Sequence, residues 1–124
     1  MKNGYKIFYH TNGEMQQLIP YKNDKREGTS AIYFYNGNIR EMINYSNDKR
    51  NGKHATYYKN TGNIKSCYIY VDDKKEGECY KFYNKKDPDG DLMIEIMYTY
   101  VNDKKCGKCK KYNIDGELIK SYII

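Results

Sequence analysis

The sequence predicts an all-β fold, an elongated single-layer antiparallel meander of about five stacked β-hairpins. Three observations predict it: a glycine recurs five positions before an aromatic residue, apolar and polar residues alternate between these landmarks, and turn-forming residues separate the alternating segments. The recurring pairs are Gly4 with Tyr9, Gly28 with Tyr33, Gly52 with Tyr57, Gly77 with Phe82, and Gly107 with Tyr112. A unit of roughly 24 residues cannot bury a core alone, so the copies must stack on their neighbours.

Each unit is expected to contain two short strands. The first follows the repeat glycine and has apolar residues at the third and fifth positions after it, as at Ile7 and Tyr9. The second follows another glycine (Gly13, Gly37, Gly62, Gly90 or Gly116) and ends on an aromatic or aliphatic residue: Tyr21, Tyr45, Tyr70, Tyr98 or Ile124. Alternation with a period of two predicts half-buried strands rather than helices. Ten strands result, in a single domain over 1–124 with repeats at approximately 4–27, 28–51, 52–76, 77–106 and 107–124.

Two kinds of turn connect the strands. The Asn12-Gly13 and Asn36-Gly37 pairs predict tight hairpins, because Asn-Gly tolerates positive φ. The other connector is nearly constant, as in residues 23–28 with the sequence NDKREG. There we expect Asn or Asp to open the turn, Gly to close it, and the charged residues to stay in water.

The composition suits a thin sheet. The chain has 16 tyrosines, no tryptophan and only 39% hydrophobic residues. A tyrosine ring can pack while its hydroxyl stays hydrated, so it can lie half buried in a single layer. The net charge of +6 permits an anionic partner without requiring one. All basic residues except Arg26, Arg40 and Arg50 are lysine, and with the abundant Asn, Ile and Tyr this is typical of an AT-rich genome, which weakens any inference from lysine to nucleic acid.

The cysteines and the first residues indicate a reducing compartment. Met1-Lys2-Asn3-Gly4 leads into the first repeat without an apolar signal segment, so we expect a cytoplasmic chain with free thiols. No apolar run approaches the roughly 20 residues of a membrane span. Cys79 and Cys109 occupy equivalent positions about 9.5 Å apart, too far for a disulfide. The Cys106-Gly107-Lys108-Cys109 group has metal or redox spacing, but a zinc site would also need Cys67, and small buried or half-buried thiols are the expectation.

The pattern of G-x4-aromatic, an alternating stretch ending in Tyr, and N-D-K-[RK]-x-G resembles the MORN-repeat variant family, including its antitoxin-like YwqK type, over essentially all of 4–124. The founding MORN motif is matched less closely, since its tightly spaced glycines are missing. The resemblance implies a twisted stack of hairpins that serves as a protein-interaction scaffold, in some members as an immunity protein, and in others at membranes. The Lys- and Asn-rich composition also resembles repeat proteins of large DNA viruses of amoebae, which would place the chain in the host cytoplasm.

Two surfaces compete as the binding site for a protein partner. A tyrosine-rich ladder of Tyr9, Tyr33, Tyr57, Phe82 and Tyr112 with Tyr21, Tyr45, Tyr70 and Tyr98 is the core candidate, and it packs within the sheet or binds a partner. The second cluster occupies strand positions that point to the opposite face of the sheet, or positions next to them, and these apolar side chains need to be covered. It consists of Phe8, Ile32, Phe34, Tyr35, Tyr58 and Tyr83. Repeat four carries an insertion at 84–91, with Lys85 and Lys86, that is either a specificity loop or neutral drift.

Other partners are also considered. The densest positive patch could bind phosphate, on nucleic acid or a membrane surface, or could be a solvated face; it comprises Lys104, Lys105, Lys108, Lys110 and Lys111. Neither end leaves room for a capping element, so we expect self-association through sheet edges, with Ile123 and Ile124 in the contact.

Catalysis has little support in the sequence. His10 and His54 occupy different places in their repeats, without a nearby nucleophile and acidic partner. Asp87, Asp89 and Asp91 imitate the start of a calcium loop, but Tyr98 stands where the bidentate Glu should be. We therefore expect a noncatalytic scaffold without cofactor or metal. An antitoxin-like protein or a basic binder of phospholipid or nucleic acid is the alternative.

Overall fold

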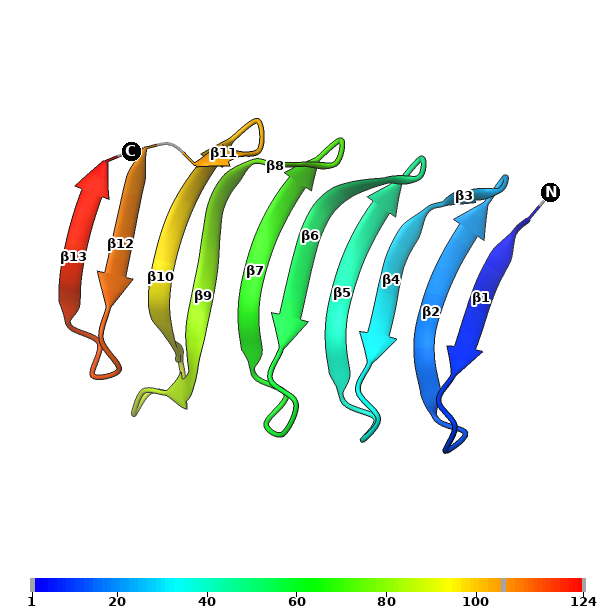
Figure 1. The fold of residues 1–124 in the computed structure, drawn as a ribbon, viewed down its shortest axis with the longest axis horizontal. Coiled ribbons are helices and arrows are strands. Elements are labelled where there is room, and N and C mark those ends of the chain that lie inside the picture. The colour runs from blue at the N-terminus through cyan, green and yellow to red at the C-terminus, as the bar shows by residue number, and fades with distance from the viewer. Residues whose placement is uncertain (1, 106, 124) are drawn as a thin grey trace.

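The computed structural model describes residues 2–105 and 107–123, and over these residues the chain is one antiparallel sheet without a helix (Figure 1). Ten longer strands follow one another across the sheet in chain order. They are β1 (Gly4–Tyr9), β2 (Met15–Lys22), β4 (Gly28–Tyr33), β5 (Ile39–Ser46), β6 (Lys49–Tyr57), β7 (Ile64–Val71), β9 (Gly77–Lys86), β10 (Leu92–Val101), β12 (Lys108–Tyr112) and β13 (Leu118–Ile123). The all-β meander predicted from the glycine spacing is thereby confirmed.

Five hairpins make up this meander: β1–β2, β4–β5, β6–β7, β9–β10 and β12–β13. Pairing inside a hairpin is long, whereas β2–β4, β7–β9 and β10–β12 each pair through only two residue pairs. In Figure 1 β1 forms one edge of the ribbon and β13 the other. The fourth junction, β5–β6, pairs through five residue pairs. At the three short junctions the contacts between hairpins therefore need support beyond the strand ladder.

The turns at the upper edge in Figure 1 correct the expectation for the charged connector. Both residues of each Asn-Asp or Asp-Asp pair have positive φ, for example 52° at Asn23 and 66° at Asp24. Positive φ at both central residues is the conformation of a two-residue I′ hairpin turn. The pair is followed by a two-residue strand that folds back on its predecessor, namely β3 (Lys25–Arg26), β8 (Lys74–Lys75), β11 (Lys104–Lys105) or the start of β6.

The Asn-Gly turns at the lower edge are looser than expected. Only the glycine has positive φ there, 87° at Gly13, and its N–H donates to the carbonyl of His10. The Asn12 side chain accepts from the N–H of Glu14, and Asn36 makes the same bond to Asn38. Side-chain capping and one left-handed glycine close these loops. The tight two-residue hairpins thus lie at the opposite edge from the one that the Asn-Gly pairs predict.

Cross-strand register defines two faces. One row can be followed through all ten longer strands, and the face that carries it is called the groove face: Ile7, Leu18, Ala31, Met42, Ala55, Cys67, Tyr80, Met97, Lys110 and Ser121. The other face is called the tyrosine face and carries Tyr21, Tyr45, Tyr68, Tyr70, Tyr98, Tyr100 and Tyr122. Successive residues of a strand point to opposite faces, so these two sets do not mix.

This register divides the predicted tyrosine ladder. Tyr9, Tyr33, Tyr57, Phe82 and Tyr112 lie on the groove face, because each follows a residue of the groove row by two positions. Tyr21, Tyr45 and Tyr70 lie opposite the repeat glycines on the tyrosine face. In repeat four it is Tyr100, not Tyr98, that pairs with Gly77. The prediction of one ladder was wrong because the repeat glycine and the aromatic residue five positions later differ in parity.

Most of the buried side chains lie on the tyrosine face. Tyr70 is 5% exposed, Cys79 is 1% exposed and Cys109 is fully buried. Burial raises the pKa of the Cys79 thiol. The thiols behave as small packing groups, as expected. Cys67 belongs to the groove row on the opposite face, and Cys106 lies outside the described residues.

A ladder of polar contacts joins consecutive upper turns. Asp48 accepts from the backbone N–H of Arg26 and, at 2.7 Å, from its Nε, while the N–H of Asp48 donates to the carbonyl of Arg26. Asp73 repeats these bonds with Arg50, and Asp103 bonds the backbone of Lys75 in the same way. The Arg26 guanidinium also lies 4.3 Å from the centroid of the Tyr45 ring. The connector therefore holds one hairpin to the next as well as turning the chain.

A second set of contacts joins the lower loops. The Tyr58 hydroxyl donates to the carbonyl of Phe82, and the Tyr83 hydroxyl donates to that of Tyr112, at 2.6 and 2.7 Å. His10 makes the corresponding bond to the carbonyl of Tyr33. In each case the residue six positions after a repeat glycine bonds the residue five positions after the next one. These bonds support the hairpins where their strands no longer pair.

The upper ladder predicts acid sensitivity. The side-chain bond from Arg26 lowers the pKa of Asp48, and backbone and side-chain bonds from Arg50 lower that of Asp73. A carboxyl whose folded pKa is lowered stabilises the fold above its unfolded pKa, and this contribution is lost as pH falls through the folded pKa. We expect the free energy of unfolding, measured with urea, to fall between about pH 5 and pH 2. The Asp48→Asn/Asp73→Asn variant keeps a residue that tolerates positive φ and should show a shallower slope, whereas an equal slope would contradict this role.

Candidate functional site

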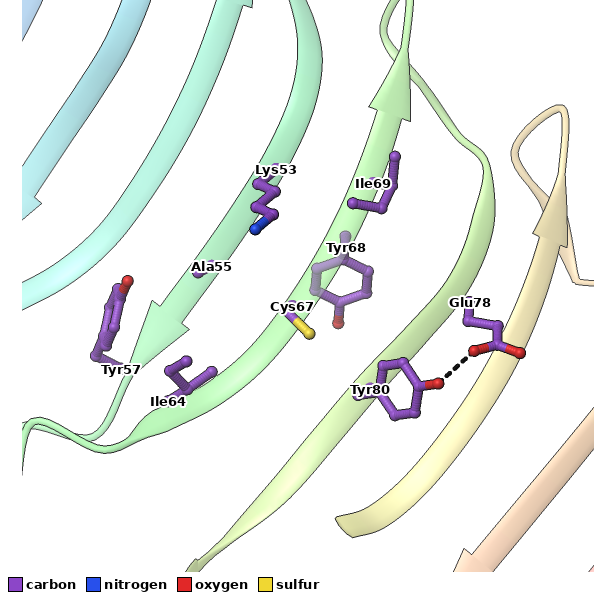
Figure 2. Close-up of a pocket in the computed structure, with 9 residues that line it drawn as sticks. All are labelled: Lys53, Ala55, Tyr57, Ile64, Cys67, Tyr68, Ile69, Glu78 and Tyr80. Carbon is purple, nitrogen blue, oxygen red and sulfur yellow. Dashed lines mark hydrogen bonds between the residues drawn. The ribbon is translucent and has the colours of Figure 1, made fainter. Parts of the chain in front are cut away.

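An apolar groove lies on the groove face across β6, β7 and β9 (Figure 2). Its volume is about 610 Å³. The residues drawn around it are Lys53, Ala55, Tyr57, Ile64, Cys67, Tyr68, Ile69, Glu78 and Tyr80, and of these Tyr68 belongs to the tyrosine face while the others belong to the groove face. No second layer covers this face in the described part of the chain, so the groove is open to solvent.

The sizes of adjacent side chains produce the groove. Ala55 pairs with Cys67, and Cys67 pairs with Tyr80, so two small residues precede a large one along the same row. Tyr57 pairs with Ile64 on the lower side of this row, and Lys53 pairs with Ile69 on the upper side. Small side chains in the floor between larger ones leave a channel along the sheet. Cys67 is half buried there, and burial raises the pKa of its thiol.

One margin of the groove is polar. The Tyr80 hydroxyl donates to the Glu78 carboxylate, as Figure 2 shows. This bond raises the pKa of Tyr80 to about 12, so the phenol stays neutral at physiological pH. Lys53 lies on the same margin, with Ile69 between the two charges. The groove thus has an apolar floor with one positive and one negative group beside it.

The predicted partner-binding cluster is distributed over several places. Phe8 and Ile32 lie in a row of the tyrosine face, in line with Glu41, Thr56 and Ser66. Phe34 and Tyr58 begin lower loops, and Tyr83 lies in β9. The two tyrosines make the bonds described above, and Tyr35 is 54% exposed. Lys85 and Lys86 end β9 and are exposed. The structure does not gather these eight residues into one surface, and a role in partner binding remains a prediction.

The predicted anion cluster is also divided. Lys110 belongs to the groove row, and Lys108 lies two residues before it. Lys111 is on the tyrosine face, where it pairs with Ile96 and Lys120. Lys104 and Lys105 form β11, and the Lys105 ammonium lies 4.0 Å from the centroid of the Tyr98 ring. Phosphate binding by the whole set remains a prediction, with only Lys108 and Lys110 on one face of one strand.

A histidine and a carboxylate meet on the tyrosine face. His54 Nε2 bonds the Glu41 carboxylate, and both side chains are largely buried. The Nδ1 of His54 is buried, and none of the described residues forms a hydrogen bond with it. The neighbouring Thr56 and Ser66 hydroxyls bond each other at 2.5 Å. The sequence analysis missed this pair, although Glu41 and His54 share face parity in adjacent strands.

The acidic insertion has a local role in its turn. The Asp87 carboxylate accepts from the N–H groups of Asp89 and Asp91. Asn84 accepts from Thr61 and Asn63 of the preceding hairpin. Within the described residues no three His, Cys, Asp or Glu side chains are placed to hold a metal ion. The insertion is therefore built like the other lower loops.

The groove residues were not singled out as a site from the sequence. The alternating pattern predicts Ala55 and Tyr57 as strand positions and Cys67 as a small buried or half-buried thiol, but it does not mark them as parts of one site. The groove residues could be recognised from small residues that pair with each other across neighbouring strands, but this requires knowing the register in which the strands pair. Repeat alignment alone misses it, because Ala31 and Ala55 are equivalent while Cys67 is the cross-strand neighbour of Ala55.

The fold and its open groove define a single-layer β-hairpin repeat protein. The family model described as MORN repeat variant matches residues 2–23 and 26–47. Each matched span runs from the residue of the upper ladder, Lys2 or Arg26, through a hairpin to the first turn residue, Asn23 or Asn47. The match carries no information on an antitoxin type or on a viral source. No curated protein matches the chain.

The described residues contain no helix that is long and apolar enough to cross a membrane.

Proposed function

We propose that this chain is a noncatalytic scaffold that binds a protein partner through the groove face. One observation carries the proposal: an apolar groove of about 610 Å³ lies open on a single-layer sheet. Exposed apolar hollows bordered by polar groups are typical of interaction sites on soluble proteins. The matched MORN repeats support this class, since such repeats commonly mediate protein or membrane binding.

The groove suits an apolar side chain with a charge on either side of it. Tyr57 and Tyr80 supply broad, semi-rigid contact surfaces at low entropic cost. Lys53 and Glu78 can orient a partner through opposite charges at the margin. The pairing of β6 with β7 and of β7 with β9 sets the spacing of these groups along the sheet.

The test blocks the floor of the groove. In Ala55→Lys the long side chain should fill the channel. We expect the affinity for a protein partner, captured with the wild type, to fall by tenfold or more, and a tenfold loss corresponds to about 1.4 kcal/mol of binding free energy. Thr29→Lys places the same charge at an exposed position of the same face outside the groove, and it should leave binding unchanged. Equal binding by the wild type and Ala55→Lys would remove the groove from the proposal.

The partners found in the same experiment separate the alternatives. A single small toxin would indicate an antitoxin-like immunity protein, whereas several partners indicate a scaffold. Binding to anionic liposomes or oligonucleotides that disappears with added salt would indicate a basic surface binder. The division of the lysines between both faces makes us favour the protein scaffold.

A further inference from the structure

The two edge hairpins expose more apolar surface than the hairpins between them. In the part of the chain that the structure describes, twelve large hydrophobic residues are exposed, and eight of them belong to the β1–β2 or β12–β13 hairpin. Those eight are Tyr5, Ile7, Phe8, Tyr9, Ile114, Leu118, Ile119 and Ile123. In the described chain β1 and β13 each have a neighbouring strand on one side only.

Comparing equivalent positions shows what a neighbour changes. Ile7 and Ala31 both stand three residues after a repeat glycine, yet Ile7 is 38% exposed and Ala31 only 5%. Tyr9 is 60% exposed, whereas Tyr33 and Tyr57 are half buried. The first strand of the described sheet therefore lacks the cover that a preceding hairpin gives to the first strand of each later repeat.

The interface that would provide this cover already exists inside the chain. At every junction the second strand of one hairpin pairs antiparallel with the first strand of the next, in the same register. Leu18 pairs with Ala31, Met42 with Ala55, Cys67 with Tyr80, and Met97 with Lys110. Within the described residues, β13 is the second strand of its hairpin and no strand follows it in the sheet, and β1 is the first strand of its hairpin and no strand precedes it.

We infer that copies of this chain associate head to tail, with β13 of one copy pairing antiparallel with β1 of the next. In the register of the internal junctions, Ser121 lies opposite Ile7 of the second copy, and Lys120 lies opposite its Phe8. At two internal junctions the equivalent pair also contains one lysine, which there stands at the position of Phe8: Lys81 opposite Ser66, and Lys111 opposite Ile96. The second copy is the occupant because only a strand with this repeat reproduces the contact.

The contact is heterologous, since it joins two different surfaces of identical chains. Such a contact leaves a free edge at each end of every assembly, so it generates an open series rather than a closed dimer. Ile123, 78% exposed, lies at the end of β13 and would be covered in the assembly; the expected contribution of Ile124 lies outside the described residues. This inference uses the sheet edges and is separate from partner binding in the groove.

The test exchanges charges across the contact. Phe8→Lys places a lysine opposite Lys120 of the neighbouring copy, and like charges directly opposite one another destabilise strand pairing. We expect sedimentation velocity to show association that grows with concentration in the wild type and is about tenfold weaker in Phe8→Lys. Val71→Lys, an exposed position in an internal hairpin, is the matched control and should associate as the wild type does.

A second variant keeps the test decisive. Phe8→Lys/Lys120→Glu should restore association, because the lysine introduced in one copy then meets the glutamate introduced in the next. Residues 8 and 120 lie at opposite edges of the same sheet, so restoration cannot come from within one chain. A wild type that stays monomeric up to its solubility limit would overturn the inference. Unchanged association in Phe8→Lys, or failure of the double variant to recover, would also overturn it, whatever the result for the groove.

Discussion

Tyr70→Ala is expected to lower the free energy of unfolding by about 3 to 5 kcal/mol, the range for removing a buried aromatic ring. Tyr70 is one of the few large side chains that the single layer buries, with 5% of its surface exposed. It lies opposite Gly52 in the neighbouring strand. The centroid of its ring is 4.4 Å from Cζ of Arg50 and 5.6 Å from the centroid of the His54 ring. Removal takes away the packing of the ring within the β6–β7 hairpin and its contact with the Arg50 guanidinium that pairs with Asp73.

The measurement is urea unfolding followed by circular dichroism, with Tyr5→Ala as the control. Tyr5 is the same residue type in a strand, but it is 69% exposed. Its truncation should cost less than about 1 kcal/mol, because little area returns to water. Equal losses for the two variants would mean that burial on the tyrosine face does not stabilise the sheet.

Gly52→Ala is expected to cost about 2 to 3 kcal/mol. Gly52 has a φ of 103°, which side chains rarely adopt, and an added Cβ would lie 3.3 Å from Nδ2 of Asn44. Asn44 has little freedom to move away, because it accepts a hydrogen bond from the Thr29 hydroxyl at 2.6 Å. Backbone strain and crowding therefore act at the same position.

Gly62→Ala separates these two effects. Gly62 also has positive φ, 74°, but an added Cβ would meet nothing within 4 Å. We expect a loss of about 1 to 2 kcal/mol, the cost of left-handed backbone alone. A greater loss at Gly62 than at Gly52 in the same unfolding measurement would contradict the role of Asn44.

The repeating strands could be read from the sequence because their signal is local. Alternation around Gly28 and Tyr33 requires only a period of two, and the structure has β4 at Gly28–Tyr33 as this predicts. The positions of the turns could also be predicted from local sequence, but the types of the turns could not. Asn-Gly has the stronger hairpin propensity, yet the tight turn formed on Asn23-Asp24, because Asp24 there bonds the backbone of Lys2 in the preceding upper segment.

The candidate site depended on information that no single repeat contains. Ala55 and Cys67 form one floor because β6 and β7 pair in that register, and Tyr80 closes it from the next hairpin. In the fourth repeat, β-bulges near the lower loop shift the pairing of β10 with β9. For that reason Tyr100, and not Tyr98, lies opposite the repeat glycine Gly77. Spacing along the chain could not predict these offsets.

By itself, the sequence determined a meander of hairpins, since glycine, alternating apolar residues and Asn or Asp act through contacts between near neighbours in the chain. Only the tertiary structure decided which side chains share a face, which aspartate joins which arginine, and where small residues leave a groove. The physical reason is that one step of register moves a side chain to the other side of a sheet. Register is set by pairing between strands, so Tyr9 and Tyr21 could look like one ladder and yet lie on opposite faces.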